Sequence, residues 1–502
     1  MRKLALLLLI LSLAPKIAGA DSIGKIIDRY KKVSGRGVER LTNTIISGSI
    51  SGEGGGAFRC VTARPERIRI DFEISGHHIT ECYNGKSAWR HDEKGLRTLL
   101  GSEARSLRLL AVILNSRLRN LSRDRVLPVA SGAAEAEGKP ASFIELQLNE
   151  TKAKLFFDSK DGSLVRIERD TSDGGEILSY SGQRTVDQIL EPSAIRIQRG
   201  QHQMTIADAR AEHNQPIDES MFRYPQIEGA APLPNLESMM RSVIANQEHI
   251  EELRERYTFR ETETERKLDR DGRVKESDTR VFEVTPIGRS FVKRLVKIGD
   301  KDLSPSELEK EDQRVQKRIE EIQKRDHKHK ERAEKANEKG EDDEEESDRI
   351  TILSFLRISE ITSVRREMFR GHEVVAFDFE PKKGFKAKSG AETIINKLAG
   401  TIWVDEQALQ VARLEARLTD SFKFGGGLLA SILPSTAFVF EQDKVGGELW
   451  LPSHTEANLA AKIFILAKLN RSMTSDYSEY KKYKIDSEYK SGSVESKKPQ
   501  VP

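Results

Sequence analysis

Residues 67–74 alternate strictly between charged and apolar side chains, and this pattern limits what the chain can fold into. The apolar positions are Ile68, Ile70, Phe72 and Ile74, and every residue between them is charged. Because successive side chains of a β-strand point to opposite faces, the segment predicts a strand with one buried face and one solvated face. Such a strand is typical of an antiparallel sheet that covers a core on one side only.

Similar runs continue along the first half of the chain and predict a meandering antiparallel sheet. They lie at residues 79–83, 143–148, 154–157, 164–168, 177–181, 194–199 and 204–209. Apolar residues at helical spacing predict two helices, one over residues 23–34 and one over residues 102–116, and we expect the second to cross the sheet.

A proline-rich segment predicts a domain boundary. Pro225, Pro232 and Pro234 fall within twelve residues, and we place a linker at 226–235. A helix and then strand-like runs follow the linker, so the order of the first half repeats without a residue-level repeat. We therefore expect one domain over 21–225, a second over 236–486 and a disordered tail over 487–502.

Residues 1–20 have the form of a secretion signal. Two basic residues precede about ten apolar ones, and the segment closes on Ala18-Gly19-Ala20, the small-residue form that signal peptidase accepts. The apolar run is too short to span a bilayer, and no later run is longer, so we expect a cleaved leader, no stable transmembrane anchor and a periplasmic location. In that oxidising compartment Cys60 and Cys82 are free to pair, but a strand expected between them separates their backbones, so the sequence leaves the bond open.

A charged insertion interrupts the second half at residues 304–349. Its apolar residues form one short stripe, Leu308, Val315, Ile319 and Ile322, which predicts a charged helix or helical hairpin. Two interpretations stay open: a helix that projects from the fold, or a coiled-coil contact with a protein partner.

Composition and motifs argue against several functions. The 83 Lys+Arg nearly balance the 80 Asp+Glu, so a nucleic-acid partner is not expected. The sequence lacks a nucleophile elbow, a phosphate-binding loop and a zinc-protease helix, and its ten histidines show no metal-ligand spacing. We therefore expect no enzyme, no metal and no cofactor.

An apolar segment follows the second glycine cluster. Leu428, Leu429, Ile432 and Leu433 form a hydrophobic run between turn residues. Two interpretations remain: a buried connection, or a lip that contacts lipid or covers a cavity mouth.

The first sheet resembles the outer-membrane lipoprotein-sorting carriers of the LolA and LolB type. The likeness is strongest over residues 56–90, where an Arg64-Pro65 turn, the strand 67–74, an Asn84-Gly85 turn and a strand with Trp89 follow in the family's order. Asn84 stands where the family has Asp. The second half resembles the same architecture more loosely, as a tandem copy.

This resemblance implies a mainly β fold of two open antiparallel half-barrels with covering helices. In that family an arginine of the Arg-Pro pair bonds the helical lid, so Arg64 is the candidate latch. A curved sheet leaves an apolar trough, and we name Ile68, Ile70, Phe72, Ile74, Arg64 and Trp89 as candidate ligand-binding residues. The alternative is that the two helices fill the trough completely.

Two functions fit this expected fold. The first is a periplasmic protein that carries a lipid or lipidated protein by apolar burial, since each buried methylene contributes about 0.8 kcal/mol. The second is a sensor or envelope scaffold of the RseB type, which binds a protein partner through the insertion 304–349.

Overall fold

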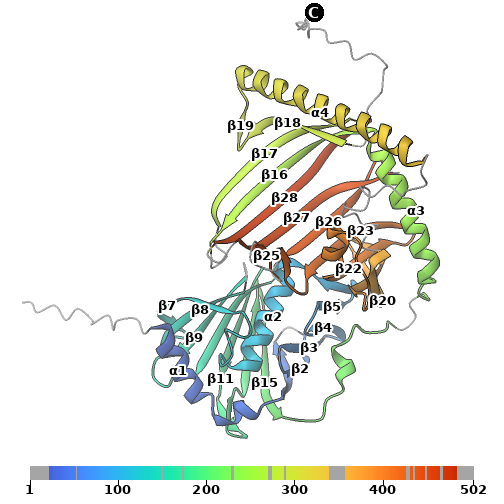
Figure 1. Ribbon diagram of the computed structural model, residues 1–502. Helices are drawn as coiled ribbons and strands as arrows, with labels where there is room; N and C mark the ends of the chain where they lie inside the picture. The colour runs from blue at the N-terminus through green and yellow to red at the C-terminus, as the bar shows by residue number, and fades with distance from the viewer. Residues whose placement is uncertain are drawn as a thin grey trace, which may run out of the picture. The chain divides into compact units, whose positions relative to one another are not determined.

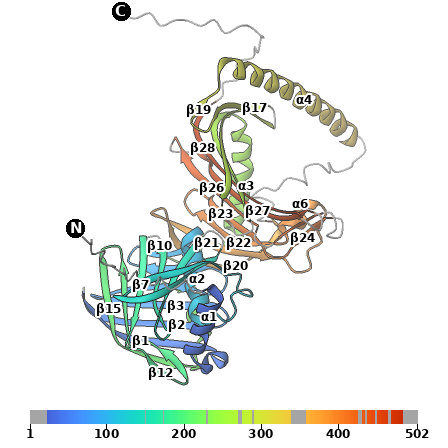
Figure 2. The ribbon, with the colours of Figure 1, turned by 90° about the vertical axis from the view of Figure 1, so that its left-hand side faces the viewer.

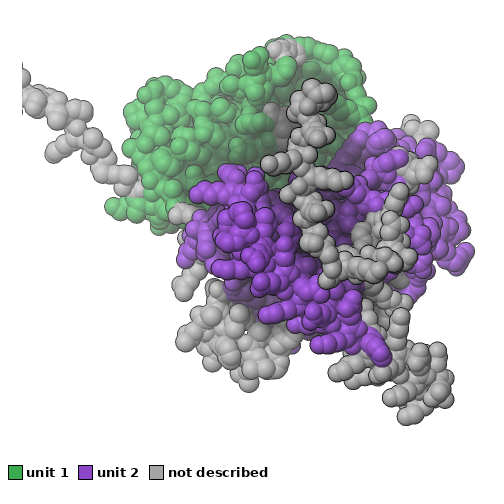
Figure 3. Space-filling view, turned by 90° about the horizontal axis from the view of Figure 1, so that it is seen from above, with its two compact units in different colours: residues 1–225 green, residues 226–502 purple. Residues whose placement is uncertain are grey.

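The computed structural model describes residues 22–52, 54–148, 151–171, 174–227, 231–269, 274–287, 290–337, 357–424, 430–433, 436–446, 449–463 and 467–482. The chain divides into two compact units, Met1–Pro225 and Gln226–Pro502, coloured green and purple in Figure 3. The predicted leader and the predicted tail 487–502 lie outside the described residues.

Unit 1 contains one open antiparallel sheet of 13 strands, with α1 and α2 against one face. Its helical segments are α1 (Ile23–Val33), η1 (Arg36–Arg40), α2 (Gly101–Ser116) and η2 (Glu219–Phe222). Its strands are β1 (Asn43–Gly52), β2 (Gly56–Ala63), β3 (Arg67–Ile74), β4 (His77–Tyr83), β5 (Ala88–Asp92), β6 (Gly95–Leu99), β7 (Leu127–Ala136), β8 (Lys139–Leu148), β9 (Thr151–Asp158), β10 (Leu164–Thr171), β11 (Gly174–Ser181), β12 (Arg184–Val186), β13 (Ile189–Glu191), β14 (Ala194–Arg199) and β15 (His202–His213). The short pair β12–β13 forms a separate ribbon.

The strand order explains the open shape of unit 1. The sheet runs β6-β5-β4-β3-β2-β1-β15-β14-β11-β10-β9-β8-β7, and its two end strands, β6 and β7, are not paired with each other. Helix α2 contacts β2 to β5 near one end of this order and β9 and β10 near the other, so the sheet curls around it (Figure 2). The face against α2 is therefore the concave face.

Unit 2 contains a second antiparallel sheet of 13 strands. Its helices are α3 (Leu236–Arg254), α4 (Pro305–Asn337) and α6 (Gly390–Ile395). Its strands are β16 (Tyr257–Leu268), β17 (Val274–Ile287), β18 (Ser290–Ile298), β19 (Lys301–Asp302), β20 (Ser359–Phe369), β21 (His372–Pro381), β22 (Leu398–Asp405), β23 (Gln410–Leu418), β24 (Phe422–Phe424), β25 (Ala430–Ile432), β26 (Ala437–Val445), β27 (Leu449–Ile463) and β28 (Ala467–Lys482). Met239, Met240 and Val243 of α3 pack with the apolar residues of β21, β22 and β23. Both sheets are antiparallel and unclosed, which confirms the predicted fold class.

The described part of the charged insertion, up to residue 337, forms the long helix α4, which lies along β18 (Figure 1). The side chain of Glu311 accepts a hydrogen bond from the backbone N–H of Leu295 at 2.7 Å, and Arg294 pairs with Asp312 at 2.6 Å. Ile322 is buried, and the other apolar residues of the predicted stripe are half-buried. Since this stripe is partly covered within the chain, a coiled-coil partner would have to displace that packing. Residues 338–349 lie outside the described residues.

Candidate ligand-binding site

The concave face of unit 1 carries the alternating residues that the sequence identified. Ile68, Ile70 and Phe72 are buried in one core cluster, and Ile74 is half-buried against it. Register explains why these side chains share a face, because Ile70 pairs with Cys60 on β2 and with Glu81 on β4. Leu107, Leu109 and Leu110 of α2 belong to the same core cluster and are almost fully buried.

The helices fill most of the predicted trough, but an apolar hollow of about 50 Å³ remains between α2 and the sheet. Ile70 and Phe72 line it, as do Leu110 and Leu114 of α2. The rest of its wall comes from strands on both sides of the curl: Ile46, Phe58, Cys60, Glu176, Leu178, Tyr180, Ile195, Ile197 and Arg199. The hollow thus lies between α2 and the strands that curl around it.

A buried ionic network joins two distant strands next to the hollow. Arg199 of β14 donates to both carboxylate oxygens of Glu81 on β4, at 2.9 and 3.1 Å, and to Glu176 at 2.6 Å. Arg169 also donates to Glu176, and Arg90 donates to Glu81 at 3.3 Å. Four strands separate β4 from β14 in the sheet, so the network bridges the curl.

The charges of this network are compensated inside the fold. Burial by itself raises the pKa of Glu81, but Arg199 and Arg169 outweigh that cost and lower the pKa to about 2. Burial likewise opposes ionisation of Glu176, and its arginine partners hold its pKa below the usual range. Sequence reasoning did not find this network. Its one visible signal is a glutamate within the apolar strand 79–83.

A second buried network lies where the chain leaves α2. Arg117 donates to both oxygens of Glu191, at 2.8 and 3.0 Å, and His213 lies 3.0 Å from Glu191 and 3.1 Å from Asp187. Burial lowers the pKa of His213, but the bond to Glu191 outweighs it, so the net shift is upward. Both nitrogens of the His213 ring therefore face carboxylates, an arrangement that favours the protonated ring.

Arg64, the candidate latch, bonds the backbone of the short segment η1. Its guanidinium donates to the backbone carbonyls of Val38 and of Glu39, the latter at 3.3 Å. These carbonyls belong to η1 rather than to α2, so Arg64 fastens the segment between α1 and β1.

Trp89 does not line the hollow. Its position pairs with Cys82, and both lie on the convex face in a cluster with Val61 and Phe222. The indole Nε1 donates to the carbonyl of Phe222 at 3.3 Å, so this tryptophan holds the end of unit 1 against the outside of the sheet.

The two cysteines are free. Cys60 faces the hollow, whereas Cys82 lies on the convex face, and β3 runs between their strands. No disulfide joins them, because the two side chains point to opposite sides of the sheet.

The predicted lip belongs to unit 2 and is described only in part. Leu428 and Leu429 lie outside the described residues. Ile432 ends β25 and packs against the core of unit 2, and the backbone N–H of Leu433 bonds the carbonyl of Ala460 at 2.8 Å. The described half of the segment is therefore attached to β27.

The described residues hold no group of three or more histidine, cysteine or carboxylate side chains suited to a metal ion. Among the same residues, no helix is long and apolar enough to cross a bilayer.

Unit 1 therefore has the architecture of an open half-barrel with helices against its concave face, which confirms the predicted resemblance at the level of the fold. No family model matches the sequence, and a search of curated proteins found none similar to it. Among solved structures, the chain is similar to a LolA superfamily protein from Nitrosomonas europaea, with 11% identity and a TM-score of 0.29 over 41% of this chain and 99% of that one.

Two other solved structures are similar. One is a DUF1329 family protein from Desulfovibrio piger, with 15% identity and a TM-score of 0.27 over 41% of this chain and 98% of that one. The other is MucB in the MucA/MucB complex of Pseudomonas aeruginosa, with 7% identity and a TM-score of 0.16 over 90% of this chain and 94% of that one.

Proposed function

We propose that unit 1 binds an acyl chain between α2 and the concave face of its sheet, and that the protein is a periplasmic carrier of lipid or lipidated protein. Binding by apolar burial needs no catalytic group, cofactor or metal. The supporting observation is the hollow between α2 and the sheet, which is lined by Ile70, Phe72, Leu110 and Leu178. An apolar void of this kind stays dry and accepts apolar guests.

A longer chain requires α2 to move, because about 50 Å³ holds only a short piece of it. The backbone beside α2 has left-handed residues at both ends: Gly101 with φ 53°, and Arg117 and Leu118 with φ 46° and 63°. For a non-glycine residue this conformation costs about 1–2 kcal/mol, so a movement of α2 that relaxes Arg117 and Leu118 recovers part of its cost.

Burial of an acyl chain offsets part of the cost of moving α2. Leu107, Leu110 and Leu114 pack on the inner side of α2, and an acyl chain in the same place replaces their contacts with its own methylenes. Each methylene contributes about 0.8 kcal/mol, so a chain of roughly ten carbons offsets the exposure of several leucines.

The variant Leu178→Phe tests this proposal. The larger ring fills the hollow from β11, so we expect binding of a fluorescent fatty acid to fall about tenfold or more while the fold is kept. Leu127→Phe is the matched control, because Leu127 lies on β7 of the same unit and is 43% exposed. Saturable binding that is equal in the wild type and both variants would contradict the proposal.

Native mass spectrometry of protein purified from membranes separates carrier from sensor. Bound lipid supports the carrier. Repeated lipid-free preparations with one co-purifying protein would instead support the sensor or scaffold function, with α4 as the first surface to examine.

A further inference from the structure

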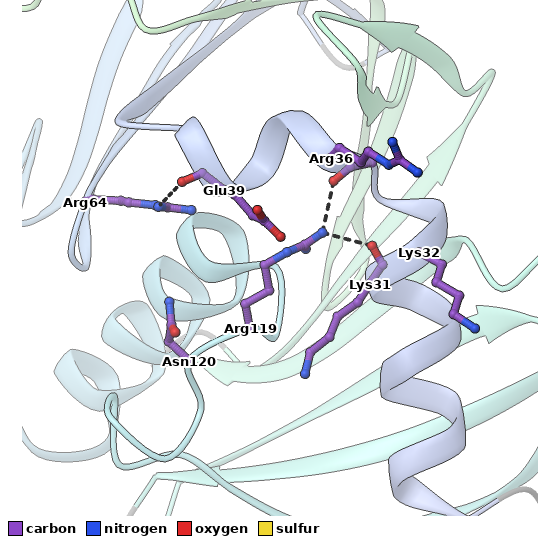
Figure 4. A pocket seen from close by; sticks show the side chains of 8 residues that line it. Lys31, Lys32, Arg36, Glu39, Arg64, Arg119 and Asn120 are labelled. Carbon is purple, nitrogen blue, oxygen red and sulfur yellow. Dashed lines mark hydrogen bonds between the residues drawn. The ribbon is translucent and has the colours of Figure 1, made fainter.

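A basic pocket of about 650 Å³ lies at the end of unit 1 where α1 and α2 both terminate. Five basic side chains and one carboxylate line it, together with Gly35 and Asn120: Lys31, Lys32, Arg36, Glu39, Arg64 and Arg119. They come from α1, η1, the residue after β2 and the segment after α2, and Figure 4 shows Arg119 between Glu39 and Lys31.

Two of these cations are held in place by the backbone. Arg119 donates to the carbonyls of Lys31 and Gly35 at 2.9 and 3.0 Å, and to the Ser34 hydroxyl at 2.9 Å. Arg64 donates to the carbonyls of η1. Within the described part of the chain, these hydrogen bonds of Arg64 and Arg119 go to carbonyl and hydroxyl oxygens and to no carboxylate.

The carbonyls at the ends of α1 and α2 carry only partial negative charge, so five cations against the single carboxylate Glu39 leave the pocket lining with a net positive charge. Burial and the neighbouring Arg123 lower the pKa of Arg64, against a weaker opposing effect of Asp124. Burial also lowers the pKa of Arg119, and this effect prevails although Glu39 lies nearby. Asp124 does not line the pocket and pairs with Arg123 at 2.9 Å. Glu39 is the one carboxylate among the residues that line the pocket.

We propose that this pocket binds a phosphate group. Arg64 is held by backbone carbonyls yet keeps N–H groups that they do not use, and these can donate to phosphate oxygens. The terminal nitrogens of Arg119 are engaged by oxygens of Lys31, Ser34, Gly35 and Arg117, so Arg119 contributes mainly positive charge. The lysines add further charge without a demand on geometry. The volume leaves room for the organic group that carries the phosphate. Carbonyl contacts position the arginines before the anion arrives, which lowers the entropic cost of binding.

The pocket lies just beyond the end of β2, a strand that lines the hollow. Cys60 of β2 lines the hollow, and Arg64 lies four residues further on, roughly 13 Å away along an extended backbone. The phosphate can therefore belong to the headgroup of a lipid whose chain occupies the hollow, or to a free phosphate compound. The site itself does not depend on the acyl proposal.

The experiment measures binding of two probes to the full chain by calorimetry at constant ionic strength. The probes are inorganic phosphate and dihexanoyl phosphatidic acid. The variant Lys32→Gln/Arg36→Gln removes two exposed cations of the pocket, so the fold is kept, and we expect roughly tenfold weaker binding. Lys25→Gln/Lys139→Gln makes the same charge change at exposed positions outside the pocket and serves as the control.

Each outcome decides the proposal. Binding of both probes, weakened only by the pocket variant, supports a site for any phosphate. Binding of phosphatidic acid but not of inorganic phosphate, again weakened only by the pocket variant, supports a site for a lipid headgroup. No saturable binding of either probe, or equal binding in both double variants, would overturn it. Leu178→Phe separates the two proposals, because loss of acyl binding through a filled hollow leaves the affinity for inorganic phosphate unchanged.

Discussion

Replacement of Glu81 by glutamine tests the buried network that bridges the curl of unit 1. Glu81 is 6% exposed and accepts hydrogen bonds from Arg199 and Arg90. The difference between an ordinary glutamate pKa of 4.5 and about 2 corresponds to about 3 kcal/mol of unfolding free energy at neutral pH. Loss of one partner of a buried ion pair typically costs 3–5 kcal/mol, in agreement with that magnitude.

The sign of the pH dependence follows from the lowered pKa. A carboxyl with a depressed pKa stabilises the fold fully above pH 4.5, and this stabilisation is lost as the pH falls towards 2. We therefore expect Glu81→Gln to be about 3 kcal/mol less stable than the wild type at pH 7. The two proteins should converge near pH 2.

Urea unfolding followed by Trp89 fluorescence measures this difference in unit 1. The chain has three tryptophans, and changing Trp403 and Trp450 to phenylalanine leaves Trp89 as the only reporter. Glu73→Gln is the control, because Glu73 is an exposed glutamate on the same sheet and should change stability by less than about 0.5 kcal/mol. A Glu81→Gln protein as stable as the control at pH 7, or a difference that persists at pH 2, would refute the reasoning.

Three further outcomes follow from the structure. The thiols of Cys60 and Cys82 should resist alkylation at pH 8 in the native chain and react only in denaturant, because burial raises the pKa of Cys60 to about 12 and also raises that of Cys82. Mass spectrometry measures the labelling, and rapid labelling of either thiol in the native chain would contradict this prediction. Because the pKa of His213 is raised in the fold, protonation of its ring stabilises unit 1 fully below pH 6.5, and this contribution is lost as the pH rises through the folded-state pKa. We therefore expect His213→Gln to lower the melting temperature more at pH 5.5 than at pH 8.5. An equal loss of melting temperature at both pH values would contradict this prediction. Ile322 of α4 is 2% exposed, and α4 contacts β18. We therefore expect Ile322→Ala to destabilise the packing of α4 by about 2–5 kcal/mol and to raise hydrogen exchange in that helix. Lys324→Ala, at an exposed position of the same helix, should change neither.

Local pattern was enough to predict much of unit 1. The period of two over residues 67–74 predicted a strand with one buried face, and Ile68, Ile70 and Phe72 are buried on one face of β3. Helical spacing located α1 and α2 to within about one residue at each end. These features depend on neighbours within one strand or helix, where the periods of side-chain direction are fixed by the backbone itself.

Pairing between distant segments decided the rest. Trp89 was expected at the ligand but lies on the convex face, because its side depends on its register with Cys82. Glu81 and Arg199 are 118 residues apart and meet only because the sheet curls. The basic pocket draws side chains from four separate segments. Alternation within a strand is written in the sequence, but which strands meet, and how tightly their sheet bends around α2, follows from the packing of the whole unit.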